Sequence, residues 1–336
     1  DLSPKFKMLG QIIAALVVIV YGGISLKGFI IPFLPSSFSH VIAIIITAII
    51  FLAQKWASNH YSFKMNSLHS VERKKAHGIS NILMHIYVYF IVGIAFLPQI
   101  YVMYTSFLKT RGYIFVGGYS LDSYKRIAGD LWNAIGNTFL IGGIALIFII
   151  VVAILIAYLV VRRRNLMNNI IDTLSMVPYI IPGSVVGIAL VIAFNRPPLV
   201  LTGSAIIMII ALIIRRLPYT IRSSVAILQQ IPMTVEEAAI SLGCSKLQAF
   251  FKVTVPMMAN GILSGAILSW VTIITELSTA IILYNRSTIT LTLSIYVQVS
   301  RGSYGTAAAY ATVLNLITIL SLLIFMKLSK TKEIAF

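Results

Sequence analysis

Residues 134–160 read AIGNTFLIGGIALIFIIVVAILIAYLV, and no side chain in this stretch is charged. A helix needs about 20 mostly apolar residues to cross roughly 30 Å of bilayer hydrocarbon, so the stretch is long enough to span a membrane. The whole chain has the same character, because 59% of its 336 residues are hydrophobic and 10% are charged, whereas about 25% are charged in a typical soluble domain. The sequence therefore predicts an all-α polytopic membrane protein.

Seven other apolar segments are candidates for membrane-spanning helices. They are residues 8–25, 38–54, 82–106, 170–194, 199–214, 262–284 and 307–327. The first two are the weakest, because two glycines interrupt the first and the second is short. We expect two N-terminal transmembrane helices and a cytoplasmic connector in residues 1–80, followed by a six-helix domain in residues 81–336.

The basic residues orient this bundle. The chain carries 26 lysines and arginines against 9 acidic residues, which gives a net charge of +17. Most of them lie in the gaps between apolar segments, which is typical of residues that set membrane topology rather than of a nucleic-acid surface. If residues 55–81 are cytoplasmic, so are residues 162–164, the segment 215–261 and both termini. Arg215 and Arg216 belong to the cytoplasmic side in this scheme.

The segment 215–261 between two predicted spans is too long for a simple connection. Thr234-Val235-Glu236-Glu237 has the T-x-x-E form of a helix capping box, and Gly243 lies where a left-handed C-terminal cap would fall. Ser245-Lys246-Leu247-Gln248 is predicted to be a second capping box, at the start of another short helix. Such a helix pair suits docking into a groove on another protein. A loop that only covers the end of the bundle is the alternative.

These residues also match a family pattern. Glu237-Ala238-Ala239, followed by Gly243 and then by Val253-Thr254-Val255-Pro256, resembles the EAA loop of ABC importer permeases. Valine replaces the family's isoleucine at position 253 and its leucine at position 255. Further phrases between about Ile82 and Leu328 are similar to permeases of the ferric iron type, which often carry two such halves. The single EAA loop implies that this chain is a C-terminal half and that residues 1–54 are a remnant of the preceding half or a substitute for it.

The resemblance implies a type I ABC importer transmembrane domain in the bacterial inner membrane, with a coupling loop at about 219–258. It implies a permease that moves a small ion, ferric iron being favoured over phosphonate, polyamine or another small solute. The implied partners are an ATPase dimer that binds ATP and Mg²⁺, an external substrate-binding protein, and a second permease half, either a homodimer partner or a fused or paired half. The coupling residues would be Glu237, Ala238, Ala239, Gly243 and Pro256.

The chain itself is not expected to be an enzyme or to hold a cofactor. It has no G-x-x-x-x-G-K-[ST] sequence for binding ATP. Its five histidines show no metal-ligand spacing with Cys or carboxylates, so no metal site is predicted. An enzyme acting on lipid-linked phosphates would need clustered carboxylates, yet residues 1–106 contain only Asp1 and Glu72.

A polar stripe runs along the predicted span 262–284. Its members recur every three or four residues and so share one helix face: Gly265, Ser269, Thr272, Glu276 and Thr279. Such a stripe either packs against another helix or lines a pathway. Glu276 lies in the outer half of the predicted helix, where it could meet a cation, pair with an arginine or cap a broken helix. A secondary transporter that uses Glu276 as a proton or ion relay is the rival function.

The predicted span 170–194 contains Pro178-Tyr179-Ile180-Ile181-Pro182-Gly183-Ser184. Two prolines and a glycine in mid-span bend a helix and free backbone carbonyls. Such breaks are tolerated where they line a cavity or pack inside a bundle. The resemblance implies that this helix flanks the pathway, which makes Tyr179 and Ser184 candidate wall residues. A static kink is the alternative.

Overall fold

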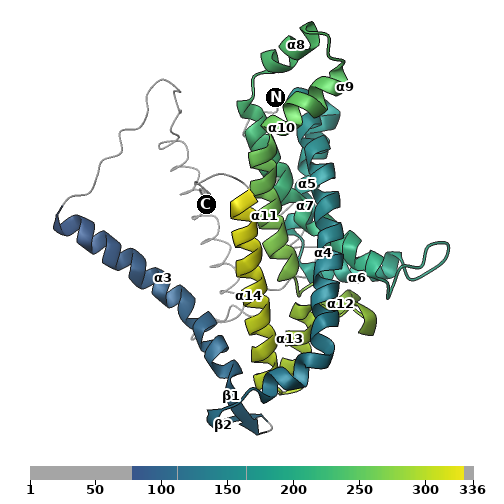
Figure 1. The fold of residues 1–336 in the computed structure, drawn as a ribbon. Helices are drawn as coiled ribbons and strands as arrows, with labels where there is room; N and C mark the ends of the chain where they lie inside the picture. Colours follow the sequence, from purple (N-terminus) through teal and green to yellow (C-terminus); the bar gives the residue numbers. More distant parts are fainter. Residues whose placement is uncertain (1–77, 112, 164, 329–336) are drawn as a thin grey trace, which may run out of the picture. The chain divides into compact units, whose positions relative to one another are not determined.

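The apolar segments fold as helices in the computed structural model, which describes residues 78–111, 113–163 and 165–328 (Figure 1). The predicted spans 8–25 and 38–54, with the connector after them, lie outside the described residues. Four helices are long: α3 (Ile79–Ser106), α4 (Asp122–Arg162), α7 (Ala205–Gln230) and α14 (Tyr304–Leu328). The all-α class predicted from the sequence is confirmed, apart from one short hairpin.

The shorter elements join these helices. In chain order they are α5 (Leu166–Ile180), α6 (Gly183–Ala193), α8 (Met233–Ser241), α9 (Lys246–Ala249), a π-helical turn (Phe250–Thr254), α10 (Val255–Met257), α11 (Ala259–Ile274), α12 (Ala280–Leu283), a 3₁₀ turn (Arg286–Thr288) and α13 (Leu291–Ser300). The hairpin pairs β1 (Leu108–Arg111) antiparallel to β2 (Ile114–Tyr119), with Thr110 opposite Phe115. Its β1 strand follows α3 directly, and the sequence did not predict it.

Three helices of the described chain, α3, α4 and α14, are long and apolar enough to cross a membrane, judged by length and composition. Two bent pairs bring the number to five if each pair is one span. These pairs are α5 with α6, bent by 107°, and the segment 246–257 with α11, bent by 65°. The predicted span 170–194 is therefore a broken helix, because Pro182 and Gly183 interrupt it.

Two of the predicted boundaries are wrong. Residues 205–214 of the span predicted at 199–214 form the first part of α7, which continues as helix to Gln230. Arg215 and Arg216 therefore lie in mid-helix rather than in a loop, and the expected coupling loop starts only after Gln230. The span predicted at 262–284 ends at Ile274, so that Glu276 lies in a turn before α12. An apolar run stops at the first charged residue, so a prediction from hydropathy ends the helix there. The backbone of α7 remains helical beyond that point, and its two arginines pair with Glu276.

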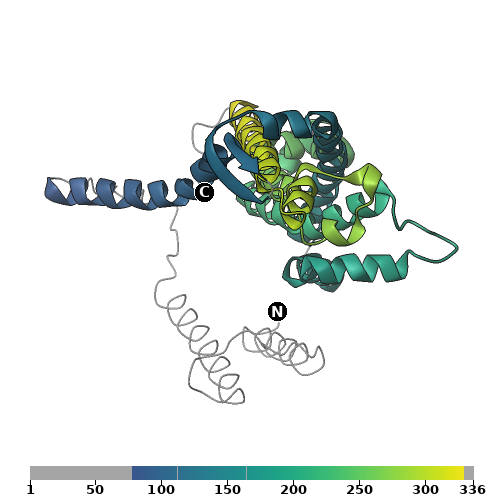
Figure 2. The same cartoon turned by 90° about the horizontal axis from the view of Figure 1, so that it is seen from below.

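The core forms where α4, α7 and α11 pack together, and Figure 2 shows these helices nearly end-on. Along α4, one side chain in every four faces the core and is at most 2% exposed: Ile141, Ala145, Ile149, Ala153 and Ala157. This spacing keeps them on one helix face. The alanines let α7 approach closely, which is a common way for membrane helices to associate.

Gly265 is a point of close approach between α11 and α7. A Cβ added there would lie 2.8 Å from the Thr220 Cα and 2.8 Å from the Ser223 Cβ. Because the Thr220 atom is backbone, the two helices would have to move apart. Gly143 on α4 gives the matched control, since a Cβ there meets nothing within 4 Å.

We predict that Gly265→Ala lowers the free energy of unfolding by about 1–3 kcal/mol, the usual cost of overpacking. Thermal unfolding of the purified chain in detergent measures this loss. Gly143→Ala should cause no loss in the same assay. Equal midpoints for the two variants would show that α7 and α11 are not in close contact at Gly265.

Candidate functional site

A helical knob of residues 233–257 projects from one end of the bundle. It comprises α8, α9, the π-helical turn and α10, and it lies at the end opposite the β-hairpin (Figure 1). This is the region whose capping pattern predicted a docking element. Its geometry is set by one turn, one buried ion pair and one aromatic contact.

The turn between α8 and α9 is centred on Gly243. Its φ of +96° is strained for residues with a Cβ. The Gly243 amide donates to the Ile240 carbonyl at 2.9 Å, and the Cys244 amide donates to the Ala239 carbonyl at 3.1 Å. These two bonds define a Schellman C-cap. The left-handed cap predicted at Gly243 is thus confirmed.

Of the two predicted capping boxes, the second is confirmed and the first is wrong. Ser245 accepts from the Gln248 amide at 3.3 Å, while the Gln248 side chain accepts from the Ser245 amide at 3.0 Å. Helix α8 instead begins at Met233, with Pro232 as its N-cap and no side-chain cap bond. Because the fixed φ of proline already suits a helix start, the helix begins before Thr234 can cap it.

A buried ion pair ties the knob to the end of α4. Arg162 Nε donates to Glu236 Oε1 at 2.7 Å, and the Tyr158 hydroxyl donates to Glu236 Oε2 at 3.1 Å. A second nitrogen of Arg162 donates to the Ile231 carbonyl at 3.0 Å. The two charged side chains are only 8% and 7% exposed. Movement of α8 is therefore linked directly to α4.

Aromatic packing supplies the second attachment. Phe250 is 7% exposed and meets the Tyr158 ring edge-on, with ring centroids 4.7 Å apart. The next residue, Phe251, is 59% exposed. One phenylalanine thus anchors the knob and the other faces outward.

The outer surface of the knob is rich in apolar side chains. Its exposed large hydrophobic residues are Met233, Ile240, Leu242, Leu247, Phe251 and Met257. Among the predicted coupling residues, Glu237, Ala238, Gly243 and Pro256 are exposed and Ala239 is half-buried. Large apolar residues grouped on one projecting element mark an interaction surface.

A second constellation lies inside the bundle, and we call Arg215, Arg216 and Glu276 the arginine–glutamate cluster. Glu276 is 4% exposed. Arg215 Nη1 donates to Glu276 Oε1 at 2.5 Å, and Arg216 donates to the other carboxylate oxygen. The Ser278 hydroxyl donates to Oε1 at 2.7 Å and the Thr279 amide at 3.0 Å. Pairing with an arginine is one of the arrangements that the sequence left open.

Several breaks in the helices meet at this cluster. Helix α11 ends at Ile274, α12 begins at Ala280, and the α5–α6 bend places Gly183 beside the same side chains. A Cβ at Gly183 would collide with Ser278, Arg215 and Thr279. A glycine at the bend therefore allows the broken span to approach the ion pair.

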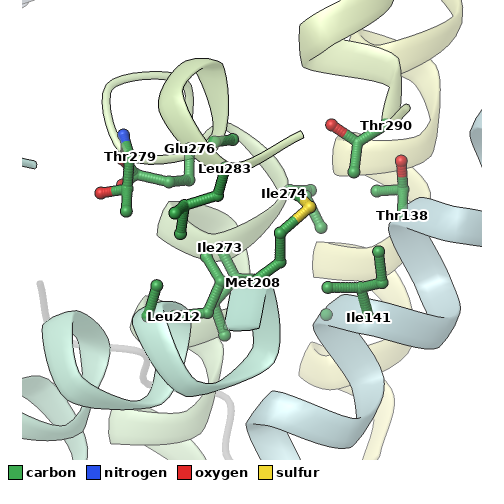
Figure 3. Close-up of a pocket in the computed structure, with 13 residues that line it drawn as sticks. Thr138, Ile141, Met208, Leu212, Ile273, Ile274, Glu276, Thr279, Leu283 and Thr290 are labelled. Atoms are coloured by element: carbon green, nitrogen blue, oxygen red, sulfur yellow. Dashed lines mark hydrogen bonds between the residues drawn. The ribbon is translucent and has the colours of Figure 1, made fainter. Parts of the chain in front are cut away.

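Beside the cluster lies a small cavity of about 20 Å³ (Figure 3), which is room for about one water molecule. Glu276 and Thr279 form part of its wall, with Thr138 and Thr290 among the other polar residues. The remaining lining is mostly apolar and includes Met208 and Ile273 (Figure 3). The size and lining fit a hydrated gap in the bundle rather than a substrate chamber.

The remaining predicted pathway residues do not gather at one place. Ser269 is fully buried and bonds to Thr220 at 2.8 Å, while Thr272 donates to carbonyls of its own helix. Tyr179 is 58% exposed and packs edge-on against Tyr219, and Ser184 is exposed. Within the polar stripe of the predicted span 262–284, Ser269 therefore serves helix packing. The pathway roles of the other candidate residues remain predictions.

Sequence reasoning missed several partners of these sites. The sequence pattern places Arg162 among the residues that set topology, Glu236 inside a capping box and Tyr158 within a span, and it pairs none of them. Arg162 and Glu236 are 74 residues apart in the chain, so no local pattern reveals their contact. The only available signal for the cluster was a carboxylate within an apolar segment, which requires a partner. No group of three or more potential metal ligands occurs among the described residues.

In sequence and in fold, the chain is similar to components of membrane transport systems. Residues 149–331 match the family model described as "Binding-protein-dependent transport system inner membrane component". The chain is 31% identical over 211 residues to a ferric transport system permease protein of Actinobacillus pleuropneumoniae, covering 61% of this chain and 31% of that protein. The chain thus spans about a third of that relative's length.

Two further similarities concern other substrates and the fold. The chain is 28% identical over 239 residues to a putative 2-aminoethylphosphonate transport system permease protein of Salmonella typhimurium, covering 70% of this chain and 88% of that protein. In fold it is similar to a chain of a bacterial ABC transporter involved in the import of alginate, with a TM-score of 0.58 and 18% identity. That match covers 74% of this chain and 95% of the other.

The Arg162–Glu236 pair gives a direct test of how the knob is held. We predict that Arg162→Met lowers the free energy of unfolding by about 3–5 kcal/mol, because it leaves Glu236 buried without its counter-charge. Thermal unfolding of the purified chain measures the loss. Arg222→Met is the matched control, since Arg222 pairs with Asp172 while its own side chain is 51% exposed. The control should lose at most about 1 kcal/mol, and similar losses in both variants would contradict the assignment.

Proposed function

The chain belongs to the family of binding-protein-dependent transport system inner membrane components, and we propose that it is the membrane-spanning permease subunit of an ATP-driven importer. The resemblance drawn from the EAA pattern is confirmed by this membership and by the ferric permease relatives. The observation that carries the proposal is the anchored knob, an apolar surface fixed to the bundle by a buried ion pair.

Under this proposal the knob binds a separate ATPase subunit. The exposed face from Met233 to Phe251 would enter a groove on that subunit, which binds ATP and Mg²⁺. Closure of an ATPase dimer would move α8, and Glu236 would transmit the movement to α4 through Arg162. Because α4 packs against α7 and α11, the movement would reach the arginine–glutamate cluster.

Two further partners complete the proposed importer. A second permease half, either another copy of the chain or a paired or fused half, would enclose the pathway with this one. An external substrate-binding protein would deliver the solute to the end of the bundle that carries the β-hairpin. We place the knob and both termini in the cytoplasm, in keeping with the basic residues that flank the spans.

Ferric iron is the favoured substrate because the ferric permease relative has the higher identity. The phosphonate permease relative supports a small oxyanion as the alternative, and it is covered over more of its length. In such an importer the binding protein would select the solute, so the permease would need only a compatible pathway. Tyr179, Ser184, Thr272 and Glu276 remain our candidates for its wall.

Two substitutions in the knob test the importer proposal. Glu237→Arg and Gly243→Val should abolish ATP-dependent uptake while leaving the chain inserted in the membrane. The first reverses a charge on the exposed face, and the second places a branched side chain at a φ of +96°. Uptake by cells expressing the full transporter, with membrane fractionation of the chain, measures both effects.

Gly243→Asn is the matched control, because asparagine tolerates a left-handed conformation and can cap the helix. It should retain much of the uptake that Gly243→Val loses. Normal uptake in Glu237→Arg and Gly243→Val would refute a coupling role for the knob. Uptake that continues without the ATPase partner would favour a secondary transporter instead.

A further inference from the structure

The arginine–glutamate cluster carries an excess of positive charge inside the bundle. Two guanidinium groups, each only 14% exposed, share the single carboxylate of Glu276. Among the described residues, the other ion pairs are formed elsewhere, by Glu236 with Arg162 and by Asp172 with Arg222. The cluster therefore has a net charge of about +1, and α6 adds the positive end of its dipole because it begins at Gly183.

Both arginines also keep an unused donor. The Nε atoms of Arg215 and Arg216 are buried and have no hydrogen-bond partner among the described residues. A buried N–H without an acceptor is costly, so an acceptor at this place would stabilise the cluster. Nε–H together with Nη–H forms the fork that binds both oxygens of a carboxylate or phosphate group.

Hydroxyl groups surround the same point. Arg215 Nη1 lies 3.0 Å from the Ser278 hydroxyl and 3.0 Å from that of Thr279. The Ser278 hydroxyl already donates to Glu276 Oε1, whereas the Thr279 hydroxyl accepts from Arg215 and can donate to an anion. Among the described residues, the cluster thus has more donors than its one carboxylate accepts from.

The two arginines are slightly exposed, and their side of α7 also carries the half-buried Tyr219. Tyr219 follows Arg215 by four residues and Arg216 by three, so all three share one side of the helix. Tyr219 contacts the exposed Tyr179 of α5, with ring centroids 5.5 Å apart. Because arginines are strongly disfavoured against lipid, this face is suited to a water-filled pathway or to another subunit.

We propose that Arg215 and Arg216 form a binding site for an oxyanion of the phosphate, phosphonate or carboxylate class. The anion would accept from the free Nε–H groups and bring the cluster close to electroneutrality. It is either the transported solute itself or the anion bound to a transported metal ion, since a bare trivalent cation would be repelled here. This inference rests on the proposed permease function for its physiological meaning.

The test is a thermal-shift titration of the purified full chain, without ATP or ATPase. Inorganic phosphate should raise the unfolding temperature in a saturable way relative to chloride at equal ionic strength. In a second arm, citrate is compared with gallium(III) citrate. A response to phosphate or to citrate alone indicates a free anion as ligand, whereas a response only to gallium(III) citrate indicates an anion that arrives with a metal.

Variants make the titration specific. Arg216→Gln leaves the cluster neutral, and it should weaken the apparent affinity by at least about tenfold, whereas Arg216→Lys should weaken it less because it keeps the charge. Arg222→Gln, on the same helix but paired with Asp172, should respond like the unmodified chain. No response in any arm, or an unchanged response in Arg216→Gln, would overturn the site. Because no uptake is measured, this result is independent of the knob variants that test the importer.

Discussion

Pairing of buried charge is the constraint on which the described bundle depends. A charged group within an apolar bundle is tolerated only with a partner, and its removal from water costs several kcal/mol otherwise. Arg162 with Glu236 satisfies this constraint at the end that carries the knob, and Glu276 satisfies it between α7 and α11. The first pair fixes the element proposed to meet the ATPase. The second holds together the ends of helices that are interrupted at Gly183 and Ile274.

The sequence predicted those features that depend on neighbouring residues. Apolar runs located α3, α4 and α14, the positive φ at Gly243 followed from its place after a short helix, and Ser245 with Gln248 formed the expected cap. The proline and glycine at 182 and 183 correctly indicated a broken span. Each of these outcomes is decided within a few residues, where backbone sterics and local hydrogen bonds dominate.

Features that depend on distant partners could not be predicted in this way. Two adjacent charges end an apolar run, so the sequence places Arg215 and Arg216 in a loop, yet they lie within α7 and pair with Glu276, about 60 residues later. The EAA pattern drew attention to Glu237, which is exposed. The buried carboxylate that holds the knob belongs to its neighbour Glu236. The difference between them is set by Arg162 and Tyr158, which belong to another helix.

The length of α4 has a consequence for how force could cross the bilayer. At about 1.5 Å per residue, its 41 residues would extend about 60 Å, roughly twice the thickness of the hydrocarbon layer. Although α4 bends near the hairpin (Figure 1), it is one continuous helix, and it can have its middle among lipid tails and its final turn beyond the headgroups. A push applied at that final turn would tilt the long part of the helix beyond the bend, and a small angular change there becomes a displacement of several ångströms at the far side of the membrane.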